Sequence, residues 1–259
     1  MNLILCEAAD IQEGGTITLT GVRATHVREV LRAAAGDEVR VGMVDGPSGR
    51  GTIVSIADDR VDVRCQFDED AIPPRPAIDL LLALPRPKVM RRLWAQLAAI
   101  GVGRIILTNA SRVERHYFDT HILSQETYRP LLIEGLQQAR DTRLPLVSIH
   151  RQFRILIEDD LDQLSDADRR LVAHPGAAPG MANVVAGDTR PARVLLAIGP
   201  EGGWNSFELD LLQRHRFTPI ALGPRTLRTD TACIALLALL HAALDSPTAT
   251  STASGSDAT

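Results

Sequence analysis

The hydrophobic pattern of the chain changes its period at a short acidic, proline-rich segment, residues 68–76. Before this segment, apolar and polar residues alternate in three stretches bounded by turn residues, 38–44, 51–56 and 60–67. After it, continuous apolar runs alternate with segments of helical period. Alternation with period two is typical of half-buried strands, whereas continuous apolar runs between helices are typical of a parallel sheet. The sequence therefore predicts a small β-barrel or sandwich over 1–70 and an α/β domain with a largely parallel sheet over 77–245.

Within the second domain, the pattern is specific enough to predict individual elements. The expected strands are 79–84, 104–108, 193–198 and 219–222, and the expected helices are 89–100, 124–140, a helix from about 206, and 231–244. Asn205 and Glu208 form a plausible capping pair for the third helix. One short helix, 26–31, is expected inside the first domain, and the tail 246–259 is too polar and simple in composition to pack.

The composition limits the location of the protein and the metals it can hold. No basic start followed by an apolar segment is present at the N-terminus, and the longest apolar run, 232–244, is too short to span a bilayer. The three cysteines, Cys6, Cys65 and Cys233, are far apart and lack metal-ligand spacing. We therefore expect a cytoplasmic protein without a membrane segment, a disulfide framework or a metal site.

Charge is distributed unevenly along the chain although the net charge is only −4. Residues 71–154 contain 12 arginines and Lys88 against 6 acidic residues, whereas residues 1–70 contain 7 arginines against 13 acidic residues. The basic segment either follows a phosphate backbone or is an ordinary solvated surface, and charge alone leaves both readings open.

A glycine-rich loop follows the predicted strand 193–198. It reads Gly-Pro-Glu-Gly-Gly over 199–203, so its backbone can approach a ligand closely and expose N–H groups. Glu201 at the strand end can orient an amine, a ribose hydroxyl or a proton; alternatively, the loop is a tight turn with a surface acid. The loop matches neither the dinucleotide fingerprint nor a phosphate-binding P-loop.

A second loop, 222–232, follows the next predicted strand and enters a helix. Asp230 lies near the positive end of that helix, and Arg225 and Arg228 either bind phosphate or pair with acids. Ligands settle at the carboxyl ends of strands in open α/β sheets, so two such loops together favour a ligand site. The remaining histidines have no spacing typical of a triad or a metal site, and surface or core roles are expected for His116, His121, His150, His174, His215 and His241.

The order strand, Gly199-Pro-Glu-Gly-Gly203, helix, strand, Leu222-Gly223 and then Leu227-Arg-Thr-Asp-Thr-Ala232 resembles the RsmE-type 16S ribosomal RNA (uracil-N3) methyltransferases of the SPOUT superfamily. The resemblance extends to most of the chain, including His26 with 30–32, the Asp45-Gly46 turn, and the pair Glu134 and Gln138. The chain departs from the family pattern at Trp204, where the family has Phe, and at Asp230, where it usually has Glu.

The resemblance implies a PUA-like β-barrel followed by a trefoil-knotted methyltransferase domain, a homodimer, and S-adenosylmethionine held mainly by backbone groups. The cofactor-binding residues it implies are Ile198, Gly199, Pro200, Glu201, Gly202, Gly203, Leu222, Gly223, Leu227, Arg228 and Thr229. The RNA-binding residues it implies are His26, Arg32, Lys88 and Arg143. The substrate would be a uridine of 16S ribosomal RNA, free or in the assembled small subunit.

Methylation of uracil N3 requires loss of the imide proton and an electrophilic carbon held in line with the nitrogen. We expect Arg228 to stabilise the negative charge on uracil or to fix a flanking phosphate, and Glu201 or Asp230 to order the site or accept the proton. Two alternatives remain: a SPOUT enzyme that methylates a ribose 2'-hydroxyl or a transfer-RNA base, and an RNA-binding module without activity.

Overall fold

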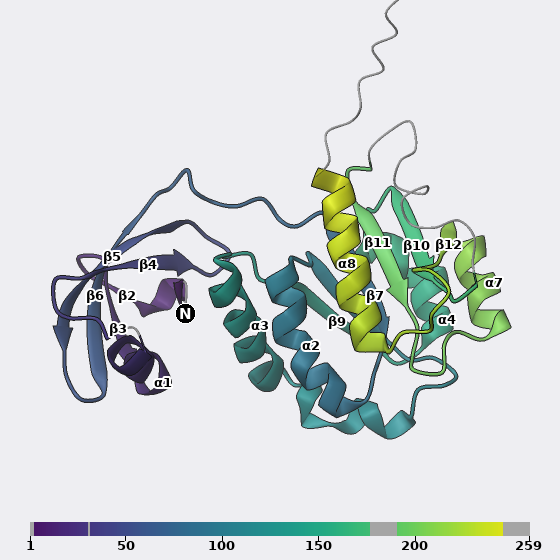
Figure 1. Cartoon of the computed structure of the whole chain (residues 1–259), viewed down its shortest axis with the longest axis horizontal. Coiled ribbons are helices and arrows are strands. Elements are labelled where there is room, and N and C mark those ends of the chain that lie inside the picture. The colour runs from purple at the N-terminus through teal and green to yellow at the C-terminus, as the bar shows by residue number, and fades with distance from the viewer. Residues whose placement is uncertain (1–2, 31, 177–190, 246–259) are drawn as a thin grey trace, which may run out of the picture.

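The computed structural model describes residues 3–30, 32–176 and 191–245, and the predicted tail at 246–259 lies outside them. Two sheets lie side by side and are joined by an extended segment that contains residues 68–76 (Figure 1). Among the helices in these ranges, none combines the length and the apolar character that a bilayer crossing requires.

The N-terminal sheet has six strands in the order β1-β4-β5-β6-β3-β2. The strands are β1 (Ile4–Cys6), β2 (Ile11–Gln12), β3 (Thr16–Thr20), β4 (Glu38–Met43), β5 (Ser48–Ile56) and β6 (Arg60–Phe67). Inward-facing residues such as Ile17, Ile53 and Val63 form its core, as the period-two pattern predicts. The short helix expected at 26–31 begins earlier: α1 (Gly21–Thr25) continues into a π-helical turn, η2 (His26–Val30).

Strand β1 belongs to both halves of the molecule. It pairs in parallel with β4, and Ile4 and Cys6 lie in the core of the N-terminal sheet. Leu3 and Leu5 on its other side lie in the core of the larger unit and pack toward helix α3 (Gln125–Ala139). The segment 68–76, predicted as the boundary, therefore lies between two sheets, and β1 contributes side chains to the cores of both.

The larger sheet has six parallel strands in the order β12-β10-β11-β7-β8-β9. The strands are β7 (Ile78–Ala83), β8 (Arg104–Thr108), β9 (Leu146–His150), β10 (Arg169–Ala173), β11 (Val194–Ile198) and β12 (Phe217–Ile220). The predicted parallel sheet is confirmed, and four of its strands lie close to their expected positions. Strands β9 and β10 were not predicted, and the last strand begins two residues earlier than expected.

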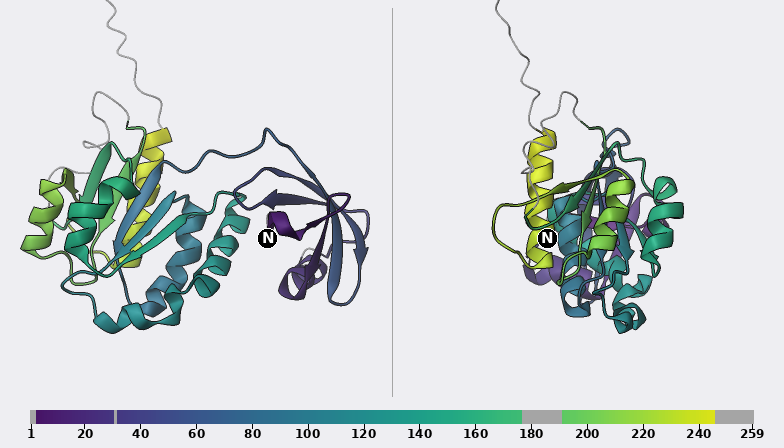
Figure 2. Two further views of the ribbon diagram at one scale, coloured as in Figure 1. Left: turned by 180° about the vertical axis from the view of Figure 1, so that it is seen from behind. Right: turned by 90° about the vertical axis from the view of Figure 1, so that its right-hand side faces the viewer.

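Helices cover both faces of this sheet (Figure 2). Helices α2 (Pro87–Ile100), α3 and α8 (Thr229–Asp245) lie on one side, and α7 (Ser206–Arg214) lies on the other. The shorter elements are η1 (Ala8–Asp10), η3 (Arg115–Asp119), η4 (His121–Leu123), α4 (Phe153–Ile155), η5 (Leu156–Asp160) and α5 (Leu161–Leu164). Trp94 of α2 is fully buried and donates its indole N–H to the Ile122 carbonyl at 3.1 Å.

Helices α2 and α3 pack closely because α3 contains a glycine at the crossing. A Cβ atom on Gly135 would lie 2.1 Å from the carbonyl oxygen of Ala95. The backbones of the two helices are therefore nearly in contact at this point, in the C-terminal half of α2.

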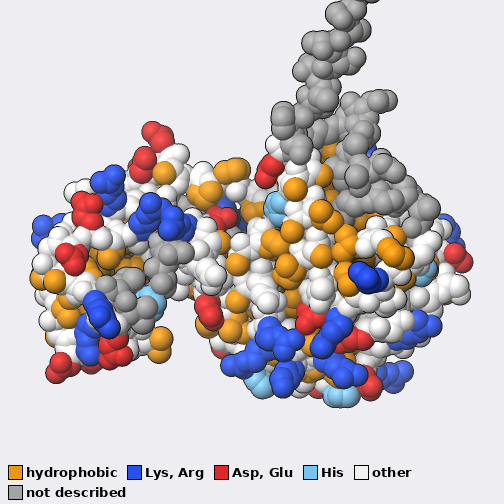
Figure 3. Space-filling model, viewed as in Figure 1, with side chains coloured by type: hydrophobic (Ala, Val, Ile, Leu, Met, Phe, Trp, Pro, Cys, Tyr) orange, Lys and Arg blue, Asp and Glu red, His pale blue; other side chains and the backbone are white. Residues whose placement is uncertain are grey.

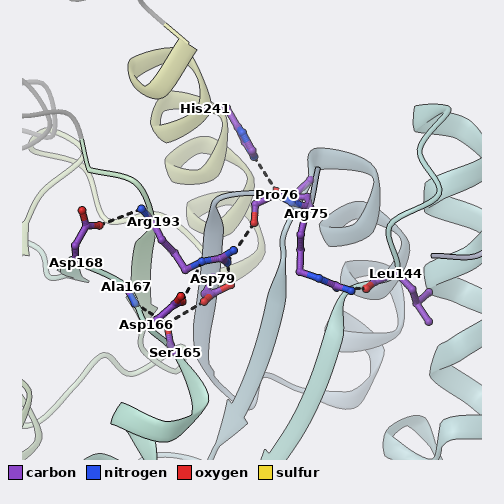
Figure 4. Close-up of polar contacts among 11 residues, drawn as sticks. Arg75, Pro76, Asp79, Leu144, Ser165, Asp166, Ala167, Asp168, Arg193 and His241 are labelled. Carbon is purple, nitrogen blue, oxygen red and sulfur yellow. Dashed lines mark hydrogen bonds and ion pairs between the residues drawn. The ribbon is translucent and has the colours of Figure 1, made fainter. Parts of the chain in front are cut away.

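A buried ion pair holds the linker against the amino ends of the strands (Figure 4). Asp79 is 2% exposed, and its carboxylate accepts hydrogen bonds from Arg193 at 3.0 Å and from Ser165 at 2.9 Å. Arg193 also donates to the Pro76 carbonyl at 3.3 Å. Asp79 and Arg193 lie at the amino ends of the neighbouring strands β7 and β11, so this network fixes that end of the sheet. The loops that carry the candidate site lie at the opposite, carboxyl end.

Candidate functional site

The loops after three adjacent parallel strands surround one cavity. Strands β10, β11 and β12 all end at the same edge of the sheet, and the loops that follow them line a cavity of about 180 Å³. The β11 loop contributes 198–204, and the segment after β12 contributes most of 220–229. The two glycine-rich loops singled out in the sequence therefore meet, at the edge where α/β sheets bind ligands.

Contacts from distant parts of the chain fix the β11 loop. Gly203 donates its N–H to the Pro200 carbonyl at 2.8 Å and has a φ of +73°, which closes a tight turn that favours glycine. Glu201 accepts a hydrogen bond at 3.2 Å from the backbone N–H of Arg86, the residue that precedes α2. The Arg112 guanidinium donates to the Gly202 carbonyl from the segment after β8. The loop is thus attached to two neighbouring connections rather than being a free surface turn.

The helix after this loop begins with the predicted capping pair. The Asn205 side chain accepts from the Glu208 N–H at 2.8 Å, and the Glu208 carboxylate accepts from the Asn205 N–H at 2.9 Å. Glu208 is 3% exposed and also accepts the Ser111 N–H at 2.6 Å. The capping pair is confirmed, and it additionally joins α7 to the segment after β8.

Asp230 in the first turn of α8 lies between two guanidinium groups. Its carboxylate contacts Arg92 at 3.0 Å, lies 3.7 Å from Arg228, and accepts the Thr231 N–H at 3.0 Å. Burial opposes ionisation, but the Thr231 N–H and the two arginines outweigh it and lower the pKa of Asp230 below its ordinary value. Asp230 is therefore a carboxylate at neutral pH, and its three partners occupy much of its acceptor capacity.

Arg228 extends from the cavity rim toward solvent. Its side chain is 76% exposed, and its carbonyl accepts the Ala232 N–H at 2.8 Å as α8 begins. Gly223, at the start of the same loop, has a φ of +87°. The loop thus places a guanidinium at the cavity mouth, where a second, larger molecule can reach it.

Two buried ring nitrogens that line the cavity have no hydrogen-bond partner among the described residues. These are Nδ1 of His174, just after β10, and Nε1 of Trp204, at the end of the β11 loop. Buried polar nitrogens are normally paired, so these two are available to a polar ligand that binds in the cavity. Sequence reasoning gave His174 only a surface or core role, because the short strand before it was not predicted.

Most residues predicted to bind a cofactor line this cavity. They are Ile198, Gly199, Pro200, Glu201, Gly202, Gly203, Leu222, Gly223, Leu227 and Thr229. Arg228 lies beside the cavity without lining it, as does Asp230. The site residues named from the resemblance are therefore brought together, except those expected to contact RNA.

The predicted RNA-binding residues lie in separate places. Lys88 is exposed in the first turn of α2 and Arg32 is exposed after η2. His26 borders a different cavity, beside α3. Arg143 donates to the carbonyls of Pro73 at 2.6 Å and Asp45 at 3.1 Å, so its guanidinium joins the linker to the N-terminal sheet.

Exposed cations lie near the cavity loops, in the first half of α2 and in the segment after β8. Lysine and arginine side chains gather over the lower part of the larger unit (Figure 3). The exposed cations in this part of the sequence are Arg86, Lys88, Arg91, Arg92, Arg112 and Arg115. Part of the basic segment recognised in the sequence thus forms a surface next to the cavity, which is the charge distribution that a polyanion requires.

Comparison with known proteins gives consistent matches over most of the chain. Residues 73–241 match the model of a family described as RNA methyltransferase domain. Ribosomal RNA small subunit methyltransferase E of Treponema pallidum is 28% identical over 252 residues, which are 93% of this chain and 92% of that protein. The protein of the same name from Bacillus subtilis is 23% identical and covers 86% of this chain and 88% of its own length.

Two solved structures have the same fold. A Legionella pneumophila protein described as a methyltransferase, in complex with S-adenosylmethionine, superposes with a TM-score of 0.74, is 23% identical, and covers 94% of this chain and 98% of its own. Ribosomal RNA small subunit methyltransferase E from Neisseria gonorrhoeae, bound to S-adenosylmethionine, has a TM-score of 0.72 and 19% identity, covering 93% of this chain and 97% of its own. Because the family model extends over more than half of the sequence, this chain belongs to the family of proteins with the RNA methyltransferase domain.

Proposed function

We propose that this protein uses S-adenosylmethionine to methylate N3 of a specific uridine in 16S ribosomal RNA, in the cytoplasm. The observation that carries the proposal is the cavity between the β11 and β12 loops, with Arg228 and Asp230 at its mouth and exposed cations around it. The names of the curated relatives and the cofactor in the related structures support this choice of reaction.

The residues of the cavity fit the proposed cofactor. S-adenosylmethionine has a flat base, ribose hydroxyls and an amino-acid part, so it needs apolar walls together with scattered donors and acceptors. Ile198, Leu222 and Leu236 supply apolar surface, and the unpartnered nitrogens of His174 and Trp204 supply polar contacts. The glycines let backbone N–H and carbonyl groups reach the ligand. When bound, the cofactor supplies an electrophilic methyl group on a sulfonium.

Arg228 is the residue proposed to act on the uracil. Loss of the N3 proton leaves negative charge on the ring, and a guanidinium at the cavity mouth stabilises that charge where it develops. Asp230, ionised and held by Arg92, positions the Arg228 side chain. The target base must leave its stack to reach this depth, as in other enzymes that modify bases.

Glu201 is the proposed proton acceptor. One of its carboxylate oxygens accepts the Arg86 N–H, and no hydrogen bond among the described residues occupies the other. Asp230 is less suited to this role because three groups already stabilise its charge. In the proposed step the N3–H bond breaks and the proton moves to Glu201; N3 would then take the methyl group of the bound sulfonium, whose S–CH3 bond would break to leave a neutral thioether.

The N-terminal sheet is proposed to be a PUA-like RNA-binding barrel, residues 1–70, followed by the catalytic domain over 77–245. The α8 helix returns from the edge strand β12 to pack on α2, β7 and β11. This path supports the trefoil knot implied by the family resemblance. His26, Arg32, Lys88 and Arg143 remain the proposed RNA contacts, and free 16S RNA or the assembled subunit is the proposed partner.

A homodimer is proposed because one side of α8 is apolar and exposed. Ala238, Leu239 and Ala242 are exposed on this helix, and Leu239 is 46% exposed. An apolar helix face of this kind is typical of an interface between subunits. In such a dimer the interface would lie on the same helix whose first turn carries Asp230.

The proposal is tested first by calorimetry with S-adenosylmethionine, and then by incubation with ribosomal RNA from cells that lack the protein. Mass spectrometry should locate one new N3-methyluridine in 16S RNA. A new methyl group on a ribose or on transfer RNA would support the proposed cofactor but show that the substrate is a different one. Absence of cofactor binding would reject the enzyme and favour a binding module.

A further inference from the structure

A second cavity lies between the N-terminal sheet and α3, outside the candidate cofactor site. Its volume is about 820 Å³. Leu5 and Val22 form apolar wall on one side, and Ile133 of α3 forms it on the other. Val22 is 87% exposed, so its side chain is open to a molecule that approaches the cavity. The cavity is therefore shaped by both units and presents apolar surface to a ligand.

The charged groups of this cavity neutralise one another in pairs. Glu7 and Arg129 are joined at 2.6 Å across the two units, and Asp10 and Arg23 lie 3.6 Å apart. Glu134 remains as a carboxylate without an ion pair among the described residues. A phosphate group would meet no uncompensated cation here, so the chemistry favours a neutral ligand that donates hydrogen bonds to a carboxylate.

Neutral polar groups lie beside that carboxylate. Nε2 of His26 is buried and has no hydrogen-bond partner among the described residues. Burial lowers the pKa of His26, so at neutral pH its ring offers one donor and one acceptor. Gln137, one helical turn after Glu134, adds an amide with both functions. This set of groups complements the edge of a nucleobase, while the apolar walls complement its face.

We propose that this cavity binds an unpaired RNA base bearing an exocyclic amino group, with its edge on His26, Glu134 and Gln137. The inference rests on the proposed function, because it names a second contact to the same RNA substrate. Uracil offers the Glu134 carboxylate only its N3–H, flanked on both sides by carbonyl oxygens that repel a carboxylate, so Glu134 favours the amino groups of adenine, cytosine or guanine. The base in this cavity is therefore distinct from the methylated uridine.

A neighbouring cavity supplies the cations that the base cavity lacks. It has a volume of about 770 Å³, and Glu38, Asp68 and three arginines line it. Arg50 pairs with Glu38 at 3.7 Å, whereas Arg40 and Arg140 have no ion pair among the described residues. Arg140 follows α3, so it lies at the end of the helix that carries Gln137. Contacts to phosphates position a nucleic acid, whereas contacts to base edges select its sequence. The two cavities therefore supply both kinds of contact for one strand.

The test measures RNA affinity by fluorescence anisotropy with a labelled 16S RNA fragment that contains the methylated uridine. Glu134→Gln should weaken binding about tenfold, because its neutral amide replaces an acceptor-only group, and His26→Ala should have a similar effect. Glu126→Gln, on the same helix but outside the cavity, is the matched control and should bind like the wild type. Calorimetry should give unchanged affinity for S-adenosylmethionine in all variants.

Ultraviolet cross-linking of wild-type protein to the same RNA identifies the base. Cross-links of adenosine, cytidine or guanosine to residues 22–26 or 129–138 are expected. A uridine cross-link there, or unchanged affinity of Glu134→Gln and His26→Ala, would overturn the inference. If the wild type still methylates 16S RNA in that case, the proposed function stands alone; loss of cofactor binding and methylation in the wild type would reject both.

Discussion

Asp230 connects two parts of the chain that are distant in sequence at the candidate site. It joins Arg92 of α2 to Arg228 of the β12 loop, so the guanidinium at the cavity mouth is oriented by a helix far away in the sequence. Its lowered pKa keeps it charged through the neutral range. When the rate of methyl transfer is measured against pH, ionisation of Asp230 should therefore cause no change in rate near pH about 7.

Replacement of Arg228 by alanine should remove methyl transfer without removing the cofactor. The side chain is exposed and does not line the cavity, so the loss concerns the charge that develops on uracil. Removal of one such donor costs about 10²–10³-fold in kcat in comparable sites. Single-turnover methylation and calorimetry on the same protein measure the two effects, and Arg228→Lys should recover part of the rate. An equal loss of rate and cofactor affinity would contradict this division of roles.

Residue identities in the two loops could be predicted from the sequence, but most of their partners could not. The glycines, Glu201, Arg228 and the Asn205–Glu208 pair are local signals that follow recognisable strands. The Arg86 N–H on Glu201 and the Arg92 guanidinium on Asp230 come from elsewhere in the chain. His174 was not predicted as a site residue because no periodic apolar pattern indicates β10, the strand that precedes it.

At the scale of elements, the predicted strands were those with unbroken apolar runs. Strand β10 begins with Arg169 and Arg170, and Arg170 is only 5% exposed and pairs with Asp162 at 2.5 Å. Strand β9 is an edge strand with Leu146 and Ile149 exposed. A buried charge in one strand and exposed apolar residues in the other remove the pattern on which the prediction depends.

Gly135→Ala should destabilise the protein although alanine is the better helix former. The new Cβ would lie 2.1 Å from the Ala95 carbonyl, so α2 and α3 must move apart. Overpacking of this kind costs about 1–3 kcal/mol. The gain in helix propensity from Gly to Ala is about 1 kcal/mol at most, so the cost is expected to be larger. Urea unfolding measures the change, with Gln96→Ala at an exposed position of α2 as control. Equal stability of Gly135→Ala and the wild type would show that the crossing is loose.

Asp62→Asn should weaken the N-terminal sheet in a pH-dependent way. Hydrogen bonds from Thr18 first, and also from Arg60 and Ser55, lower the pKa of Asp62 and join three strands. A lowered carboxyl pKa stabilises the fold above the ordinary Asp pKa, and this stabilisation is lost as pH falls through the folded-state value. We expect a loss of about 1.5–3 kcal/mol at pH about 7, shrinking below pH about 4. Denaturant unfolding at pH about 7 and at a series of values below pH about 4 measures the loss. A difference between variant and wild type that is independent of pH would contradict the assignment.

At the scale of the whole molecule, α8 connects the site to the exposed apolar face. The same helix begins with Asp230 and carries Leu239 further along. If the proposed dimer forms there, subunit pairing and site geometry depend on one element. Dissociation should then reduce activity as well as mass.

Leu239→Glu should dissociate the proposed dimer. A charge placed against its symmetry mate costs several kcal/mol, so the dimer dissociation constant should rise by at least about tenfold. Light scattering after size-exclusion chromatography measures the mass. Val54→Glu, at a similarly exposed apolar position on β5, is the control and should leave the mass unchanged. A dimer that survives Leu239→Glu would place the interface elsewhere.

Strand β1 has a consequence for the order of events during synthesis. Ile4 and Cys6 can be covered as soon as the N-terminal sheet has been made, but Leu3 and Leu5 are covered only after α3, which ends at Ala139, has left the ribosome. At about 5–20 residues per second, the first strand translated therefore waits several seconds with one apolar side bare. A bulky group fused before residue 3 should therefore hinder the packing of β1 into both cores.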